Sequence, residues 1–144
     1  MKARSHRSGE RHLTEQLGAT GLRLTPQRQQ VYDVLVQKRD HPTAEEVFIR
    51  AKKAMPEISH ATVYNCLDVL VKSGLARQVT VERGATRFCP NMMEHGHFHC
   101  RKCGTIYDVD FPTELAGLVL PHGFQPQHNE LIIHGICAAC AVEK

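Results

Sequence analysis

The sequence predicts an α+β fold in two parts, and three observations support this prediction. Segments with helical apolar spacing fill the first half of the chain, and a hairpin pattern follows them. Short strand-like segments dominate the last third. Two Cys-x-x-Cys pairs, at 100–103 and 137–140, enclose that last part. We therefore expect a winged helix-turn-helix domain over residues 1–88, a hinge over 89–96, and a small α/β dimerisation domain with a four-cysteine zinc site over 97–144.

Four segments of the first part carry the signals of helices. Thr25, Thr43 and Ser59 are N-cap residues, and Thr25 is followed by a proline at the first helical position. Glu46 completes a capping box with Thr43. Gly74 stands where a helix ends in a left-handed residue. The expected helices cover residues 10–19, 26–38, 44–55 and 60–73.

A hairpin is expected directly after the fourth helix. Polar and apolar residues alternate over 76–81, a turn follows, and residues 86–88 form the return strand. Three helices followed by a two-stranded hairpin is the order of a winged helix-turn-helix. A generic helical domain is the alternative interpretation of this pattern.

The second part is predicted to be a small α/β unit. Strands are expected at 105–109 and 130–136, with a helix near 113–120 between them. The last strand is rich in Leu and Ile, and few residues are present to cover it. This imbalance favours pairing with a second copy of the chain, and hence a homodimer.

Charge divides the chain in the same way. Of its 144 residues, residues 1–87 include 15 Lys and Arg against 9 Asp and Glu, whereas residues 88–144 include 3 against 6. The first part is therefore suited to a polyanion such as double-stranded DNA. No apolar run is long enough for a membrane span, and residues 1–12 lack the apolar segment of a signal peptide. We expect a cytoplasmic protein with no membrane partner.

The two Cys-x-x-Cys pairs indicate a structural metal site. Cytoplasmic thiols stay reduced, so paired cysteines favour a metal over a disulfide. Two pairs supply the four sulfur ligands of a closed Zn²⁺ site. Three disulfides in a secreted chain are the alternative. We expect structural zinc to be bound by Cys100, Cys103, Cys137 and Cys140.

Histidines just before the first Cys pair indicate a second metal site. His95 and His97 are two residues apart, so on a strand both imidazoles face the same side and can share a cation. Cys89 offers a thiolate and Asp108 a carboxylate. If His41 of the first domain joins them, the metal ties the two domains together and acts as a conformational switch. Surface histidines without a shared ligand are the alternative.

The fourth expected helix carries side chains that can read DNA. Tyr64 can contact a thymine methyl group, and Asn65 can form paired hydrogen bonds with adenine. Ser59 and Thr62 lie at the helix N-terminus, where backbone amides attract a phosphate. Packing or solvated roles are the alternative for Tyr64 and Asn65. Three arginines could neutralise phosphates or enter a narrow minor groove: Arg23, Arg28 and Arg77.

Four segments together resemble the ferric uptake regulator family. They are GLRLTPQR at 21–28, HPTA at 41–44, ATVYN at 61–65 and HGHFHCRKCG at 95–104, and they occur in the family's order. The resemblance covers nearly the whole chain. It implies a dimeric winged-helix repressor of an inverted-repeat operator, with a regulatory metal at the hinge.

The resemblance also implies roles for individual residues. The four paired cysteines match the family's structural zinc ligands. Four residues match ligands of a regulatory Fe²⁺, Mn²⁺ or Zn²⁺: His41, His95, His97 and Asp108. Three residues match positions that meet DNA: Arg23, Tyr64 and Asn65. Glu94 and Gly96 replace familiar ligands of the family's additional metal site, which leaves Glu114 and His128 as its candidates.

The resemblance leaves two branches of the family open. Tyr64-Asn65 and the spacing from residue 89 to Cys100 are similar to the peroxide-stress branch. In that branch nitrogen and oxygen ligands hold ferrous iron, and peroxide leads to oxidation of a ligand histidine. Cys89 stands where a carboxylate is expected. A thiolate favours Zn²⁺, as in the zinc-uptake branch, and is itself open to oxidation, which would give a thiol-based peroxide sensor. The third alternative is that Cys89 is a bystander beside an iron or manganese site.

Enzymatic alternatives are a zinc hydrolase using His95, His97 and Asp108, or a dithiol oxidoreductase. A hydrolase needs an open coordination position and a base, and the sequence has no His-Glu-x-x-His motif. A redox Cys-x-x-Cys opens a helix after a strand, whereas Gly104 follows the first pair here. A metal-storage protein would leave the helical domain without a task. We therefore expect a regulator and not an enzyme.

Overall fold

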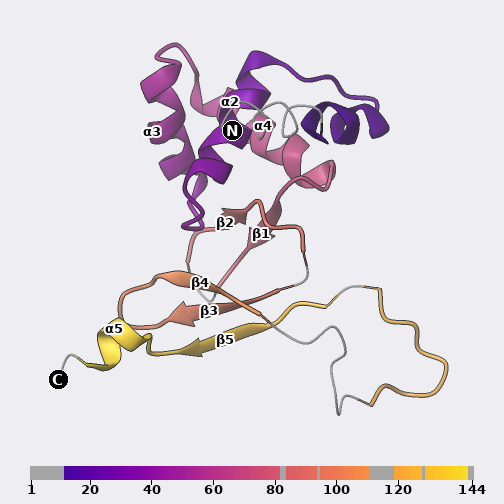
Figure 1. Cartoon of the computed structure of the whole chain (residues 1–144), viewed down its shortest axis with the longest axis vertical. Coiled ribbons are helices and arrows are strands. Elements are labelled where there is room, and N and C mark those ends of the chain that lie inside the picture. Colours follow the sequence, from indigo (N-terminus) through magenta and orange to yellow (C-terminus); the bar gives the residue numbers. More distant parts are fainter. Residues whose placement is uncertain (1–11, 82–83, 94, 111–118, 128, 143–144) are drawn as a thin grey trace, which may run out of the picture. The chain divides into compact units, whose positions relative to one another are not determined.

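The computed structural model describes residues 12–81, 84–93, 95–110, 119–127 and 129–142. The chain divides into two compact units, Met1–Met92 and Met93–Lys144. The first unit carries helices and a two-stranded sheet, and the second carries a three-stranded sheet and a short helix (Figure 1). This is the α+β organisation that the sequence predicts.

Three helices of the first unit begin where the sequence predicts, and the start of the helix expected at 10–19 lies outside the described residues. Residues 12–19 are helical, and the later helices are α2 (Pro26–Gln37), α3 (Ala44–Ala54) and α4 (His60–Lys72). The three N-caps, Thr25, Thr43 and Ser59, each accept a hydrogen bond from the backbone amide three residues on. Gly74, with φ +72°, ends α4 in the left-handed conformation that glycine adopts without strain.

The apolar faces of these helices form the core of the first unit. Leu35 of α2, Val47 of α3 and Leu70 of α4 are fully buried, as are Leu13 and Leu17 of the first helical segment. Each such side chain contributes about 1.5–3 kcal/mol on removal from water. The first unit therefore has an apolar core of its own.

A hairpin follows α4 and joins the segment before α3. Strand β1 (Arg77–Val79) pairs antiparallel with β2 (Arg87–Cys89). Thr43 forms an isolated bridge with Arg87, and the backbone N–H of Phe88 donates to the carbonyl of Pro42 over 2.9 Å. Cys89 is the first residue of the expected hinge over 89–96. In the structure it belongs to β2, where it lies opposite Arg77.

Strand β3 (Gly96–Cys100) is the central strand of the second unit. It pairs antiparallel with β4 (Ile106–Val109) and parallel with β5 (Ile132–Gly135). A one-turn helix, α5 (Ala138–Ala141), follows β5 and is not predicted from the sequence. Most of the helix expected at 113–120 falls outside the described residues. Among the described helices, none combines the length and the apolar character needed to cross a lipid bilayer.

An ion pair stabilises the loop between α2 and α3. Arg50 donates to both carboxylate oxygens of Asp40, over 2.8 and 2.7 Å. These hydrogen bonds lower the pKa of Asp40 below its ordinary value. The charged form of Asp40 therefore favours the folded state.

We expect Asp40→Asn to lower the free energy of unfolding by about 1 kcal/mol at neutral pH, since both partners are partly exposed. The contribution of Asp40 is complete above pH about 4, the ordinary carboxyl pKa, and disappears as pH falls through the lowered folded-state pKa. Urea denaturation of both proteins across this range measures the difference. Glu57→Gln, at an exposed carboxylate, is the control, and equal unfolding free energies for Asp40→Asn and wild type at neutral pH would contradict the prediction.

Candidate metal centres and nucleic-acid interface

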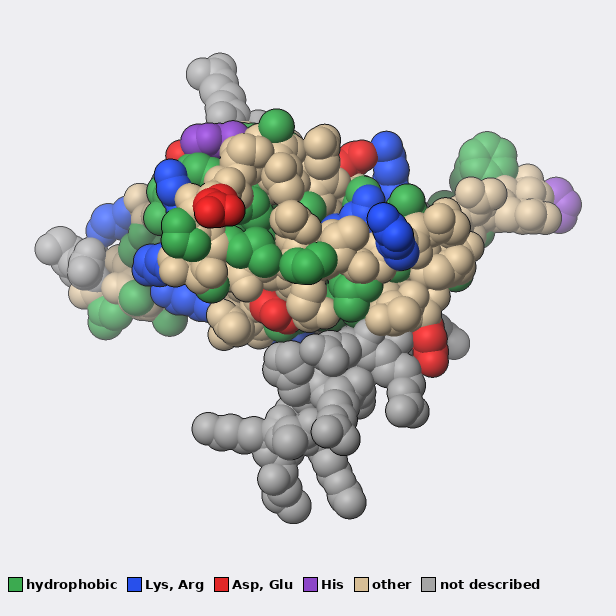
Figure 2. Space-filling model, turned by 90° about the horizontal axis from the view of Figure 1, so that it is seen from above, with side chains coloured by type: hydrophobic (Ala, Val, Ile, Leu, Met, Phe, Trp, Pro, Cys, Tyr) green, Lys and Arg blue, Asp and Glu red, His purple; other side chains and the backbone are tan. Residues whose placement is uncertain are grey.

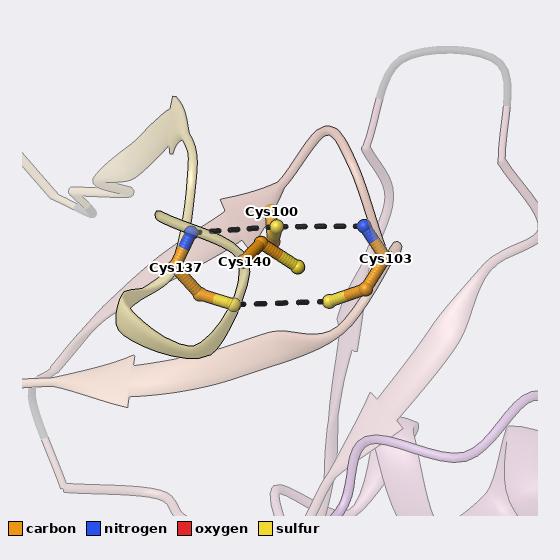
Figure 3. A group of neighbouring side chains, drawn as sticks. All are labelled: Cys100, Cys103, Cys137 and Cys140. Atoms are coloured by element: carbon orange, nitrogen blue, oxygen red, sulfur yellow. Dashed lines mark hydrogen bonds between the residues drawn. The ribbon is translucent and has the colours of Figure 1, made fainter. Parts of the chain in front are cut away.

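The four paired cysteines come together in the second unit. Cys100 ends β3, Cys103 lies in the following turn, Cys137 precedes α5, and Cys140 lies within α5. All four sulfur atoms lie within 4.8 Å of one another, and they converge on one point (Figure 3). The sulfurs of Cys103 and Cys137 are 3.9 Å apart. The tertiary fold thus unites two pairs that are distant in the sequence.

Backbone amides stabilise the thiolate form of two cysteines in this cluster. The amides of Cys103 and Cys137 donate to the sulfur of Cys100, over 3.5 and 3.4 Å, and these bonds lower the pKa of Cys100 to about 6. The amide of Cys140 likewise lowers the pKa of Cys137. The pKa of Cys140 is raised to about 12, because its thiol is held as a hydrogen-bond donor to Cys137. A cation that binds the cluster would displace the remaining protons, because cysteines bind metals as thiolates.

The geometry fits Zn²⁺. With Zn–S bonds of about 2.3 Å, neighbouring sulfurs of a tetrahedral site lie about 3.8 Å apart. The observed 3.9 Å between Cys103 and Cys137 is close to that value. Gly104, with φ +78°, closes the first turn through a 2.8 Å bond from its amide to the carbonyl of Cys100. Four sulfur ligands fill a zinc ion's coordination, so this site has a structural character.

A second group of possible ligands lies in the first unit. His41 and Cys89 are buried, and each offers a ligand atom within 4.8 Å of the other. His41 has φ +55°, an uncommon value for a residue with a side chain. The guanidinium of Arg87 donates to the His41 carbonyl over 3.0 Å, which holds this turn against β2. Strand β2 therefore positions both His41 and Cys89.

A third group of ligands lies in the second unit. His97 and Asp108 face each other across β3 and β4, and the Nε2 atoms of His95 and His97 lie 3.0 Å apart. Both nitrogens approach an Asp108 oxygen, at 3.3 and 3.4 Å. The Nδ1 of His95 donates to the carbonyl of Met93 over 2.7 Å, so its Nε2 presents a lone pair. Two imidazoles and a carboxylate thus lie close together, and the His-x-His spacing predicted the part of this arrangement in which both imidazoles face the same side.

The other candidate ligands, Glu114 and His128, lie outside the described residues. The structure therefore groups five of the seven predicted ligands beyond the four-cysteine site into two sets, one in each unit. His41 and Cys89 form the first set. His95, His97 and Asp108 form the second.

Helix α4 presents the side chains predicted to meet DNA. Tyr64 is 52% exposed, and Asn65 is exposed beside it. A hollow of about 200 Å³ between α2 and α4 is lined by Arg28, Thr62 and Asn65, among others. Cys66 also borders this hollow, but burial raises the pKa of its thiol. It therefore has little thiolate with which to react.

The other residues predicted to contact DNA lie on different segments and differ in exposure. Ser59 is exposed, but its hydroxyl accepts the capping bond from the Thr62 amide over 3.1 Å. Arg23 is exposed and Arg77 is half-buried in β1. The face in Figure 2 shows Lys and Arg side chains interspersed with Asp and Glu side chains.

Sequence reasoning missed three positioning contacts. Arg87 holds His41, and His60 stacks on Phe48 with ring centroids 3.6 Å apart while its Nε2 lies 3.1 Å from Glu45. The two contacts of His60 fasten the start of α4 to α3. Each of the three joins residues from different elements, and no sequence spacing signals such a contact.

Known proteins are similar to this chain in sequence and in fold. The sequence model of the ferric uptake regulator family matches residues 19–134. The peroxide operon regulator of Bacillus subtilis is 37% identical over 132 residues, covering 88% of this chain and 90% of that protein. The solved structure of the Campylobacter jejuni peroxide stress regulator is 30% identical, with a TM-score of 0.64, over 80% of this chain and 89% of that one. The solved structure of the Vibrio cholerae ferric uptake regulator is 26% identical, with a TM-score of 0.68, over 86% of this chain and 98% of that one.

We expect Cys137→Ser to lose the zinc held by the four cysteines, because one sulfur ligand and the amide-supported turn are disturbed together. Metal analysis of the purified protein should show about one equivalent fewer per chain. Thermal melting followed by circular dichroism should show a less stable second unit. Cys66→Ala is the matched control, since Cys66 lies in the helical core, and it should keep the metal. Equal zinc in Cys137→Ser and wild type would refute the assignment.

Proposed function

Because the chain belongs to the ferric uptake regulator family, we propose that it is a metal-dependent repressor that binds an inverted-repeat operator as a homodimer in the cytoplasm. It is a regulator and not an enzyme, like the peroxide regulators to which it is similar. One observation carries the proposal. The unit with an exposed recognition helix and the unit with the zinc cluster each hold an incomplete set of metal ligands.

Each of the two sets is short of a full set of metal ligands. His41 and Cys89 supply two ligands, and His95, His97 and Asp108 supply three. Neither set alone gives the four or more ligands that a bound transition metal usually has. We propose that both sets share one ion. Side chains from both units on one ion would restrict how the units move relative to each other. A coupling of about 1–3 kcal/mol changes DNA occupancy by tenfold or more.

In this proposal, side chains of α4 contact the DNA bases. Tyr64 and Asn65 are exposed on one helix, where they can reach the base edges of a major groove. Arg28 and Thr62 border the neighbouring hollow and can contact phosphates, with Arg23 and Arg77 as further cations. Two copies present two such helices to the half-sites of an inverted repeat.

The second unit supports the homodimer. Phe98 of β3 lies between Tyr107 of β4 and Ile133 of β5, in one row across the sheet. Tyr107 and Ile133 are 42% and 41% exposed, and Ile136 beyond β5 is 49% exposed. A hollow of about 550 Å³ lies beside this row. An exposed apolar row of this kind is suited to a second copy, whose sheet would cover it.

Peroxide is the signal that we propose. Relatives 37% and 36% identical to this chain are a peroxide operon regulator and a peroxide-responsive repressor. The unit that carries His95, His97 and Asp108 supplies only nitrogen and oxygen donors to the shared site. A ferrous ion held there would supply the electrons that reduce peroxide. The ligand histidines His41 and His95 are then placed to take up an oxygen atom.

Zinc sensing is the second candidate, and Cys89 is the observation that favours it. Its side chain is only 1% exposed and lies beside His41. A buried thiolate in a ligand set shifts preference towards Zn²⁺. Manganese remains compatible with the histidine and aspartate ligands alone.

Metal dependence is tested by DNA binding. We expect the protein to bind an inverted-repeat duplex about tenfold or more tightly with Mn²⁺ or Fe²⁺ than after chelation. A scrambled duplex should show weaker binding in both states. His97→Ala should lose the response to metal, whereas His122→Ala, in an exposed turn, should keep it. Equal affinity of the wild type with and without metal would exclude the switch.

Peroxide sensing and zinc sensing are distinguished by treating the iron-loaded protein with mild peroxide and then analysing it by mass spectrometry. We expect His41 or His95 to gain an oxygen atom, with loss of DNA binding, because these side chains are ligands of the oxidised ion. Zinc-loaded protein is the control and should show no histidine oxidation. Unmodified histidines with two zinc ions per chain in protein purified without oxygen would favour the zinc sensor.

A further inference from the structure

Strands β3 and β5 bring together two histidines that belong to none of the sites above. His99 lies opposite His134 in the parallel register of these strands. Their Nδ1 atoms are 3.1 Å apart, and the ring centroids are 5.3 Å apart with the planes at 87°. Both side chains are half-buried.

The spacing of these nitrogens is that of two ligands on one ion. With metal–nitrogen bonds of about 2.0–2.1 Å, two ligands of a tetrahedral ion lie about 3.3 Å apart, and about 3 Å at smaller angles. The Nε2 atoms of His95 and His97 show the same close approach, at 3.0 Å, within a set of possible metal ligands. A neutral pair can form one hydrogen bond only if the two rings adopt opposite tautomers.

The two histidines of β3 turn to different neighbours. His97 lies opposite Asp108 of β4, whereas His99 meets His134 of β5. On the other side of His99, β4 presents Ile106, which is buried and offers no ligand. The pair is therefore separate from the proposed regulatory site, although it lies on the same strand.

We propose that His99 and His134 form a further binding site for a divalent transition metal, with Zn²⁺ as the best-suited ion. Imidazole nitrogens suit Zn²⁺, Ni²⁺ and Cu²⁺. Two protein ligands leave the remaining positions to water, so this site is open and weaker than the four-sulfur site. The proposal does not depend on the proposed function, because it requires neither DNA nor the regulatory ligands.

An ion at this pair would join the two strands that carry the cysteine pairs. His99 directly precedes Cys100, and His134 lies three residues before Cys137. The amide of Arg101 donates to the carbonyl of Gly135 over 2.8 Å, which continues the β3–β5 pairing up to the cysteines. A cation bound here thus stabilises the same pairing that brings the two cysteine pairs together.

The test is a Zn²⁺ titration of the full chain whose cysteine site is already zinc-loaded, followed by calorimetry. We expect His134→Leu and His99→Leu to lose one equivalent per chain, or to bind that equivalent about tenfold or more weakly. His122→Leu, which removes an exposed histidine, should match the wild type. His134→Asp restores a metal ligand and should recover binding. The same number and affinity of zinc ions in His134→Leu and wild type would overturn the proposal.

A measurement on the wild type decides the question even if the variants fold poorly. Diethyl pyrocarbonate modifies accessible imidazoles, and peptide mass spectrometry locates the modification. With the cysteine site zinc-loaded throughout, additional Zn²⁺ should protect His99 and His134 while His122 continues to react. If His99 and His134 react equally with and without the additional Zn²⁺, the pair is a hydrogen-bonded contact and the site does not exist.

Discussion

The register of β3 is the constraint on which the metal chemistry of the second unit depends. Its antiparallel pairing sets Asp108 opposite His97, and its parallel pairing sets His134 opposite His99. The same parallel pairing carries Cys137 to Cys100. A slip of one residue would turn each ligand to the other face of the sheet. One strand therefore determines whether the sulfurs and imidazoles meet.

Apolar packing contributes little to that register. Among the described residues of the second unit, the buried apolar side chains are Cys100, Ile106 and Cys137, and two of these belong to the four-cysteine cluster that could hold a metal ion. A unit with so small a core needs another source of stability. Backbone amides lower the pKa of Cys100, whereas the hydrogen bond to Cys137 raises the pKa of Cys140. A metal ion held by the four sulfurs would supply the stability that so small a core does not.

The first unit is stabilised differently, and this difference shapes the regulation. Its helices bury a continuous apolar core, and capping side chains fix where they begin. In the proposed regulation, this core holds helix α4, and a regulatory ion acts on where that helix is placed. His41, in a left-handed conformation secured by Arg87, is a ligand that the first unit offers to the proposed site.

Local signals in the sequence determined much of this protein. Thr25, Thr43 and Ser59 predicted the helix starts, because a cap interacts only with its own first turn. The cysteine pairs and the His-x-His spacing predicted metal ligands, because three or two residues of chain already bring their side chains together. Only the tertiary structure decided that His99 meets His134 and that Arg87 holds His41. These partners are 35 and 46 residues apart, and their contact depends on strand register and hairpin docking, which no short stretch of sequence encodes.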